Sequence, residues 1–127
     1  MNLPVHIRRS ADSEVIVASV TGDVDIEEDP KIQGAIEAAL ADDAGGLIID
    51  LTGVRYFDST GVRWLFDVQR KLQFSRHRFR LVVPKDGVVR HVLTIVNIDK
   101  HVPVHTTADE ALTELADAGT RGAVNDP

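Results

Sequence analysis

The residues best placed to do chemistry lie in a short polar segment, residues 56–61, which reads YFDSTG. An apolar-periodic run begins directly after it, so the segment is predicted to end a strand and open a helix. Serine is among the most frequent N-cap residues, and on that interpretation Ser59 only closes the first helical turn. Alternatively Ser59 is a phosphorylation site. A phosphate of about −1.5 to −2 charges would then lie beside unpaired helical amides at the positive end of the helix dipole. From these residues alone, the cap is the preferred interpretation.

The helix that follows has two distinct sides when residues 61–74 are placed at about 100° per residue. The side predicted to face the core carries Gly61, Leu65, Val68 and Leu72, with Trp64 on its flank. The flank nearest Ser59 carries Val62 and Phe66, with Arg63 and Arg70 beside them. This flank is either a docking surface for a partner or a place where Phe66 covers the edge of the core under a neighbouring helix.

Catalytic and metal-binding patterns are missing from the sequence. It contains no cysteine, which excludes disulfides, thiolate zinc sites and cysteine nucleophiles. It has no Gly-x-Ser-x-Gly elbow and no Gly-x-x-x-x-Gly-Lys phosphate loop. The acidic run at 23–29 lacks the glycine and glutamate that a calcium loop requires at its sixth and twelfth positions. We therefore expect no enzyme activity, no metal and no cofactor.

Length and charge restrict the class of protein further. The chain has 127 residues, about one domain, and 43% hydrophobic residues, enough for one core. Its net charge of −6 argues against nonspecific binding to nucleic acids or to anionic membranes. No apolar run approaches the roughly 18 residues of a membrane span, and the N-terminus lacks a secretory pattern. We expect a cytoplasmic protein.

Strands and helices are predicted to alternate along the chain. The strands are expected at 3–10 and 14–21 as a hairpin, at 47–51 as a buried central strand, at about 79–83, and at 102–104 as a short edge strand. The first helix is expected from Pro30 to about 44, and the second, directly after the polar segment, over 61–74. A third is expected from an Asp86 cap to a left-handed stop at Asn97, and a fourth after a Thr107–Glu110 capping box. This order predicts a single mixed α/β domain with a four- to five-stranded sheet, an N-terminal hairpin and about four helices. The domain would span 1–118, with a loose tail at 119–127.

Three motifs together resemble one known family. Residues 47–72, LIIDLTGVRYFDSTGVRWLFDVQRKL, are similar to the central strand, phosphorylation turn and switch helix of STAS domains, specifically of the bacterial anti-sigma factor antagonists. Residues 21–25, TGDVD, resemble that family's Gly-Glu-Leu-Asp turn, and residues 92–99, VLTIVNID, resemble its Leu-x-x-x-Gly-Leu-Asp helix end. The sequence departs from the pattern at Val62-Arg63, where the family continues Leu-Gly, and at Asn97, where it has glycine.

The resemblance implies a partner switch. The unmodified antagonist would bind an anti-sigma factor that is itself a serine kinase and so release a sigma factor. That kinase would phosphorylate Ser59, in preference to Thr60, and end the complex, and a phosphatase would reset it. The partner-binding residues implied are Asp23, Asp25, Asp58, Thr60, Gly61, Val62, Arg63, Phe66 and Arg70. The alternative is a STAS scaffold or sensor that holds a nucleotide, lipid or protein without a phosphate cycle.

Overall fold

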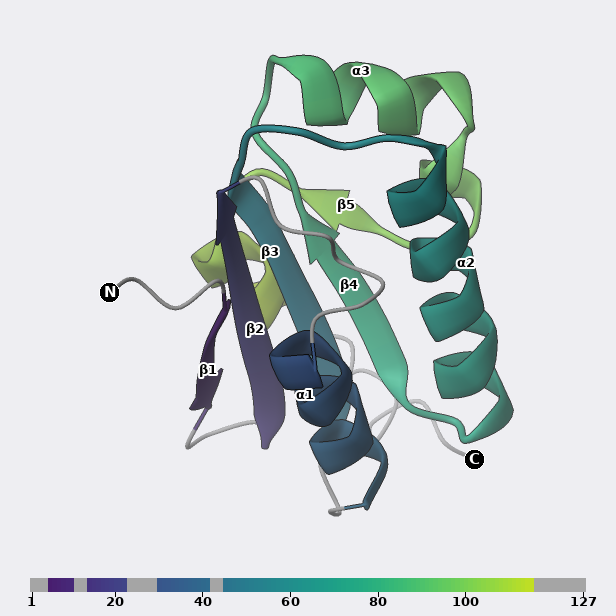
Figure 1. Cartoon of the computed structure of the whole chain (residues 1–127). Helices are drawn as coiled ribbons and strands as arrows, with labels where there is room; N and C mark the ends of the chain where they lie inside the picture. Colours follow the sequence, from purple (N-terminus) through teal and green to yellow (C-terminus); the bar gives the residue numbers. More distant parts are fainter. Residues whose placement is uncertain (1–4, 11–13, 23–29, 42–44, 116–127) are drawn as a thin grey trace, which may run out of the picture.

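The fold is a five-stranded sheet with helices packed on both faces (Figure 1). It is seen in a computed structural model that describes residues 5–10, 14–22, 30–41 and 45–115. The predicted mixed α/β architecture with an N-terminal hairpin is confirmed. The predicted tail at 119–127 lies outside the described residues.

The sheet contains one antiparallel pair and three parallel pairs. Strands β1 (Val5–Arg9) and β2 (Val15–Gly22) form the predicted hairpin. Strands β3 (Gly46–Val54), β4 (Arg78–Val82) and β5 (Val104–His105) follow in parallel, so the order across the sheet is β1-β2-β3-β4-β5. The short edge strand is confirmed, but β5 begins at Val104 rather than at 102, so Pro103 precedes the strand instead of lying inside it.

Strand β3 is longer than the sequence predicts. It was expected to end at Leu51 but continues to Val54, because β2 shifts register between Ser19 and Thr21 and then pairs Gly22 with Val54. A side chain at Gly53 would place its Cβ 2.8 Å from Thr21 Cγ2, so glycine permits this close approach of the two strands. The extension carries the parallel pairing almost to the turn that precedes α2.

The helices start and stop largely where expected. Helix α1 (Pro30–Ala41) begins at its proline, and α2 (Ser59–Phe74) ends at Phe74. Helix α3 (Val88–Ile95) is followed by the 3₁₀ helix η1 (Ile98–Lys100), and Asn97 between them adopts the predicted left-handed conformation, with φ of 56°. Residues 108–115 form the last described helical segment, and Thr107 Oγ1 accepts from the Glu110 amide at 3.1 Å.

Two predicted caps are corrected. Asp86 does not cap α3, because the N-cap position is held by Gly87 at φ 108°, a backbone conformation that an L side chain rarely adopts. The predicted capping box would have the Glu110 carboxylate bonded back to Thr107. In the structure this carboxylate instead accepts from the hydroxyl of Thr106, one residue earlier, at 2.9 Å.

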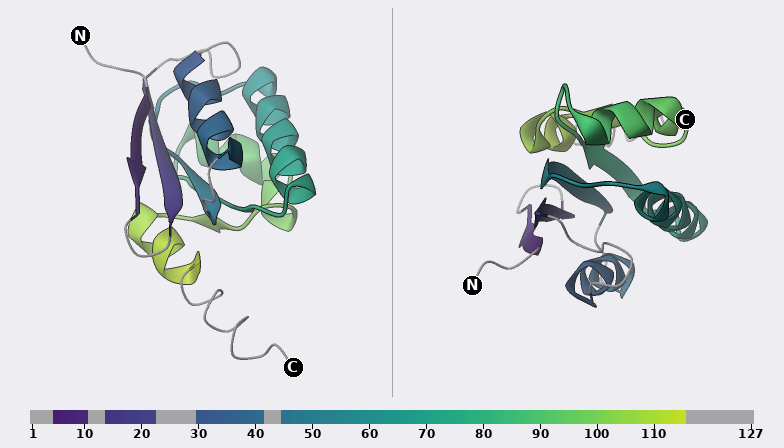
Figure 2. Two further views of the ribbon diagram at one scale, coloured as in Figure 1. Left: turned by 90° about the horizontal axis from the view of Figure 1, so that it is seen from below. Right: turned by 45° about the horizontal axis from the view of Figure 1, so that its top comes forward.

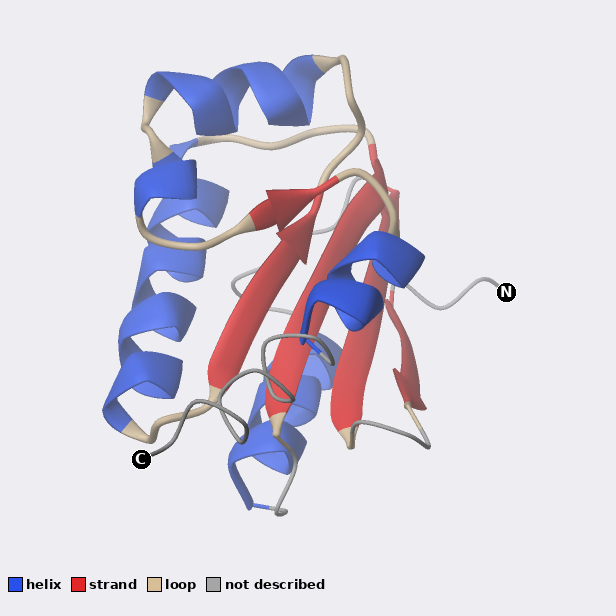
Figure 3. Ribbon diagram, turned by 180° about the vertical axis from the view of Figure 1, so that it is seen from behind, coloured by secondary structure: helices blue, strands red, loops and turns tan. Residues whose placement is uncertain are grey.

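The core has two parts, one on each face of the sheet (Figure 2). On one face α1 and α2 cover alternate strand residues, and the five buried residues of α2 are those predicted to face the core: Gly61, Trp64, Leu65, Val68 and Leu72. On the other face the helical segment 108–115 lies across the strands (Figure 3). Its Ala111 and Leu115 pack against Val15, Val17, Ile48 and Val82. Within the described part of the chain, no helix is long and apolar enough to cross a membrane.

Candidate functional site

The candidate site is the turn that joins β3 to α2. It lies at the edge of the sheet where the parallel strands β3 and β4 end, below α3 in the view of Figure 1. The Arg55 amide donates to the Gly22 carbonyl at 3.2 Å, so the ends of β2 and β3 lie side by side at the start of this turn. Asp23 and Asp25, predicted to bind a partner, follow Gly22 but lie outside the described residues.

Asp58, and not Ser59, is the N-cap of α2. Its backbone is extended, at φ −129° and ψ −169°, and its Oδ1 accepts from the amides of Thr60 at 3.1 Å and Gly61 at 3.3 Å. Its carbonyl accepts from the Val62 amide at 3.1 Å. The interpretation of Ser59 as a cap is therefore wrong. The carboxylate of Asp58 satisfies the first turn, where negative charge is favourable.

The second oxygen of the same carboxylate is also engaged. Tyr56 donates its hydroxyl proton to Asp58 Oδ2 at 3.1 Å, although both side chains are exposed. This hydrogen bond, together with the negative charge of Asp58, stabilises the protonated phenol and raises the pKa of Tyr56 above 10.0. One carboxylate thus fixes the turn, because its Oδ1 binds the first amides of α2 and its Oδ2 binds the Tyr56 hydroxyl. Tyr56 was not among the predicted site residues, because its only signal in the sequence is its spacing of two residues from Asp58.

Ser59 is the first residue of α2 and its side chain is exposed. Among the described residues, none makes a hydrogen bond with its hydroxyl, and the adjacent Thr60 is exposed as well. One expectation needs correction: the helical amides of Thr60, Gly61 and Val62 are all occupied by Asp58 and are not free to receive a phosphate. The serine is accessible, but among the described residues only its own amide, of those in the first turn, has no bonding partner.

Gly61 lets an aromatic ring pack under the turn. Phe57 is 5% exposed, and a Cβ added at Gly61 would lie 2.8, 2.9 and 3.1 Å from its Cε1, Cζ and Cδ1 atoms. Distances of this kind are shorter than ordinary van der Waals contact. The glycine after the two hydroxyl residues therefore has a packing role: it brings the start of α2 directly onto the buried Phe57 ring.

One side of α2 presents the Ser59 face, which we define as the side chains of Ser59, Val62, Arg63, Phe66 and Arg70. Val62 and Phe66 are half-buried and pack against the main core. The Phe66 ring also meets the His101 ring edge to face, at a centroid distance of 5.3 Å and 76° between planes. Phe66 therefore covers the edge of the core at the end of η1, while part of its surface stays accessible. His101 was not singled out, because only the tertiary fold brings it to Phe66.

The two arginines of the Ser59 face differ in their partners. Arg70 forms an ion pair with Asp67 one turn earlier in α2, and the two side chains are 71% and 42% exposed. Arg63 is exposed, and no ion-pair partner is found for it in the part of the chain that the structure describes. The guanidinium of Arg63, the cation nearest to Ser59 along α2, is thus available to pair with an added negative group.

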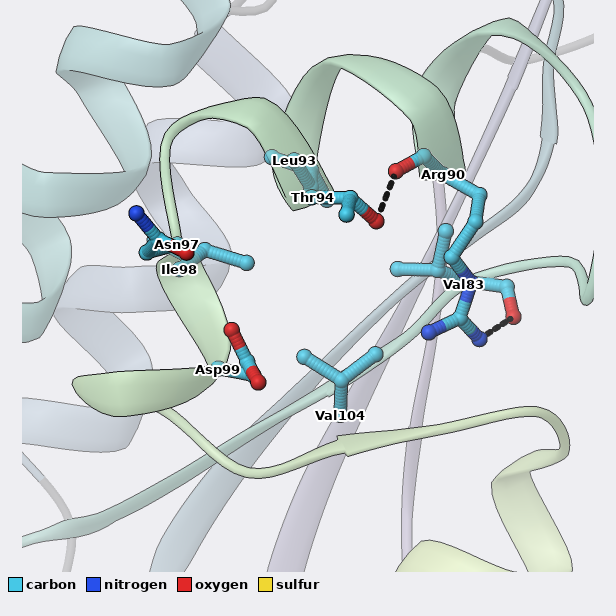
Figure 4. Close-up of a pocket in the computed structure, with 8 residues that line it drawn as sticks. All are labelled: Val83, Arg90, Leu93, Thr94, Asn97, Ile98, Asp99 and Val104. Atoms are coloured by element: carbon cyan, nitrogen blue, oxygen red, sulfur yellow. Dashed lines mark hydrogen bonds between the residues drawn. The ribbon is translucent and has the colours of Figure 1, made fainter.

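A separate pocket of about 160 Å³ lies between α3, η1 and the ends of β4 and β5 (Figure 4). Arg90 lies at its edge, donating from Nε to the Pro84 carbonyl at 2.9 Å and from Nη2 to the Val83 carbonyl at 3.1 Å. Its other lining residues are Leu93, Thr94, Asn97, Ile98, Asp99 and Val104. No residue of the Ser59 face lines it, so this pocket is distinct from the predicted phosphorylation site.

Comparison with known proteins matches residues 6–111 to the STAS domain family. The anti-sigma-F factor antagonist RsfB of Mycobacterium tuberculosis is 31% identical over 108 residues, which cover 85% of this chain and 83% of RsfB.

Solved structures show the same fold. An anti-sigma factor antagonist from Mycobacterium paratuberculosis superimposes with a TM-score of 0.73 at 30% identity, over 88% of this chain and 92% of its own. The Bacillus cell fate determinant SpoIIAA in its phosphorylated form superimposes with a TM-score of 0.66 at 20% identity, over 87% and 98% of the two chains. At that lower identity, the likeness to SpoIIAA concerns the fold.

Proposed function

Because the chain belongs to the STAS domain family, we propose that it is an anti-sigma factor antagonist whose binding is switched off by phosphorylation of Ser59. The observation that carries this proposal is the position of Ser59. Its side chain is exposed at the first residue of α2 and is not used as the cap of that helix. An approaching kinase can therefore reach it without unfolding the turn.

The partner in this proposal is an anti-sigma factor. We take its docking surface to be the Ser59 face, where the half-buried Val62 and Phe66 lie beside two exposed arginines. Asp58, Thr60 and Gly61 complete the surface at the start of the helix, and Asp23 and Asp25 follow the neighbouring end of β2. Aromatic and arginine side chains of this kind are enriched in protein interfaces. The anti-sigma factor would itself be the serine kinase, and a separate phosphatase would restore the free hydroxyl.

Phosphorylation would act on binding through charge. A phosphate adds about −1.5 to −2 charges at neutral pH, and an unpaired charge buried in an interface costs several kcal/mol. About 5.5 kcal/mol is sufficient to change a complex from almost fully bound to almost fully free. One phosphate in the centre of the contact is therefore enough to act as a switch.

The experiment is a pull-down of the anti-sigma factor with wild type, Ser59→Ala and Ser59→Asp, with Thr60→Ala as the matched control. We expect Ser59→Ala to hold the partner in the presence of ATP, Ser59→Asp to bind weakly, and wild type to lose the partner as mass spectrometry detects phosphate on Ser59. Thr60→Ala controls for the acceptor hydroxyl: it should still be phosphorylated on Ser59 and lose its partner when ATP is present. A wild-type protein that stays unmodified beside its anti-sigma factor and ATP, or a Ser59→Asp protein that binds as well as wild type, would refute the switch.

A second function, a STAS sensor without a phosphate cycle, is favoured by the pocket between α3 and β5. It is lined by the charged residues Arg90 and Asp99 together with apolar residues (Figure 4). These groups suit a small ligand with both polar and apolar parts. In that case neither Ser59 variant would change partner binding, whereas Arg90→Ala would.

A further inference from the structure

Phosphorylated Ser59 would lack most of the free amides that a helix start usually supplies. The amides of Thr60, Gly61 and Val62 are already bonded to Asp58, through its carboxylate and its carbonyl. The same carboxylate is adjacent to Ser59 in the chain, and like charges that close repel one another. A cation from a side chain would therefore stabilise a phosphate at this position.

Arg63 is positioned to be that cation. On a helix, residues four apart are neighbours on the same face, with Cβ atoms about 5–6 Å apart, and this spacing separates Ser59 from Arg63 in α2. Arg63 is the only lysine or arginine in the turn after Ser59. Its side chain is exposed, and no ion pair holds it elsewhere among the described residues.

The other arginine of the Ser59 face offers a contrast. Arg70 lies almost two turns further along α2 and is paired with Asp67. Arg80 is likewise occupied, because its Nε donates to Glu114 Oε2 at 2.6 Å. Arg63 is therefore the cation of α2 with both the right spacing and an available guanidinium, whose planar fork matches a phosphate.

We propose that Arg63 is the internal counter-ion of phosphorylated Ser59. This rests on the proposed function, since it concerns the phosphorylated form of the same site. Phosphorylation then changes the Ser59 face twice: it adds a dianion, and it neutralises the arginine that the unmodified face presents to its partner. The pair also covers part of the phosphate, so a phosphatase must displace Arg63 before it can act.

The test places phosphoserine at position 59 by genetic encoding, so that no kinase is required. Phosphorus NMR then follows the second ionisation of the phosphate, normally near pH 6, in the wild-type sequence, Arg63→Ala, Arg63→Lys and Arg70→Ala. A nearby cation favours the dianion and lowers its pKa. We expect Arg63→Ala to raise that pKa by about half a unit, Arg63→Lys to raise it less, and Arg70→Ala to leave it unchanged. The difference should shrink at high salt.

An Arg63→Ala phosphoprotein whose phosphate titrates as in the wild type would overturn the proposal, and so would an equal shift in Arg70→Ala. Because the phosphate is installed without an enzyme, this outcome is independent of whether a kinase modifies Ser59. Conversely, a protein that no kinase modifies would refute the proposed switch and leave the measured pairing of Arg63 unaffected.

Discussion

Replacing Gly61 with alanine tests whether the start of α2 is fixed by its contact with Phe57. Alanine is favoured over glycine inside a helix by about 1 kcal/mol, so propensity alone predicts a more stable protein. The added methyl group, however, would lie within 2.8–3.1 Å of three carbons of a ring that is only 5% exposed. Overpacking of this kind typically costs about 1–3 kcal/mol. We expect a net loss of about 1 kcal/mol in the free energy of unfolding.

Gly34 supplies the matched control. It lies in α1, its residue is exposed, and a Cβ there would meet nothing within 4 Å. Gly34→Ala should therefore raise the free energy of unfolding by about 1 kcal/mol. For a domain of this size, the two variants should differ in melting temperature by roughly 6–10 °C, measured by circular dichroism or calorimetry.

The ring can be tested directly in a double variant. Phe57→Leu removes the atoms nearest to the new methyl group, so Gly61→Ala should be less harmful in that background than in the wild type. A Gly61→Ala protein as stable as Gly34→Ala would refute the reasoning, because the ring would then have moved at no cost.

Three further predictions concern groups outside this contact. Asp58→Ala should lower the free energy of unfolding by about 1 kcal/mol through loss of the cap and bring the pKa of Tyr56 down towards 10.0, which is readily measured because the chain has one tyrosine. Arg80 lowers the pKa of Glu114 below 4.5, so the stabilisation from this pair is complete above the unfolded pKa and is lost as pH falls through the folded pKa. Denaturant unfolding from neutral to acid pH should therefore show that Glu114→Gln loses less stability on acidification than the wild type does. Leu115→Ala should cost about 2–4 kcal/mol by the same unfolding measurements, because Leu115 is fully buried, whereas Leu112→Ala should cost less since Leu112 is only half-buried. A normal Tyr56 pKa in the wild type, an unchanged acid profile in Glu114→Gln, or a harmless Leu115→Ala would each contradict the corresponding contact.

Sequence periodicity was sufficient to predict most elements. The apolar spacing of α2 identified all five of its buried residues, and Pro30 located the start of α1. Strand β3 was predicted too short because its last residues pair with β2 only after a register shift. That shift depends on a neighbour distant in sequence. Local patterns predict local structure and leave such pairings undetermined.

The candidate site shows the same limit at the level of single residues. Asp58 and Ser59 are adjacent and have similar preference for the N-cap, so composition cannot decide between them, whereas the extended backbone of Asp58 does. The contact of Phe66 with His101 joins α2 to the end of η1, and the pocket at Arg90 gathers residues from 83 to 104. Both arise only after the chain has folded.

The sheet has its strands in the same order as the chain, from β1 to β5. During synthesis each strand can therefore join the growing edge of a sheet that has already left the ribosome, and no strand has to be inserted between two others. The early hairpin provides a template of low sequence separation, and each later addition closes a loop that contains one α-helix, with η1 as well before β5. We expect nascent chains that end after β4 to be the most prone to aggregate, because their open edge has not yet been covered by the short final strand.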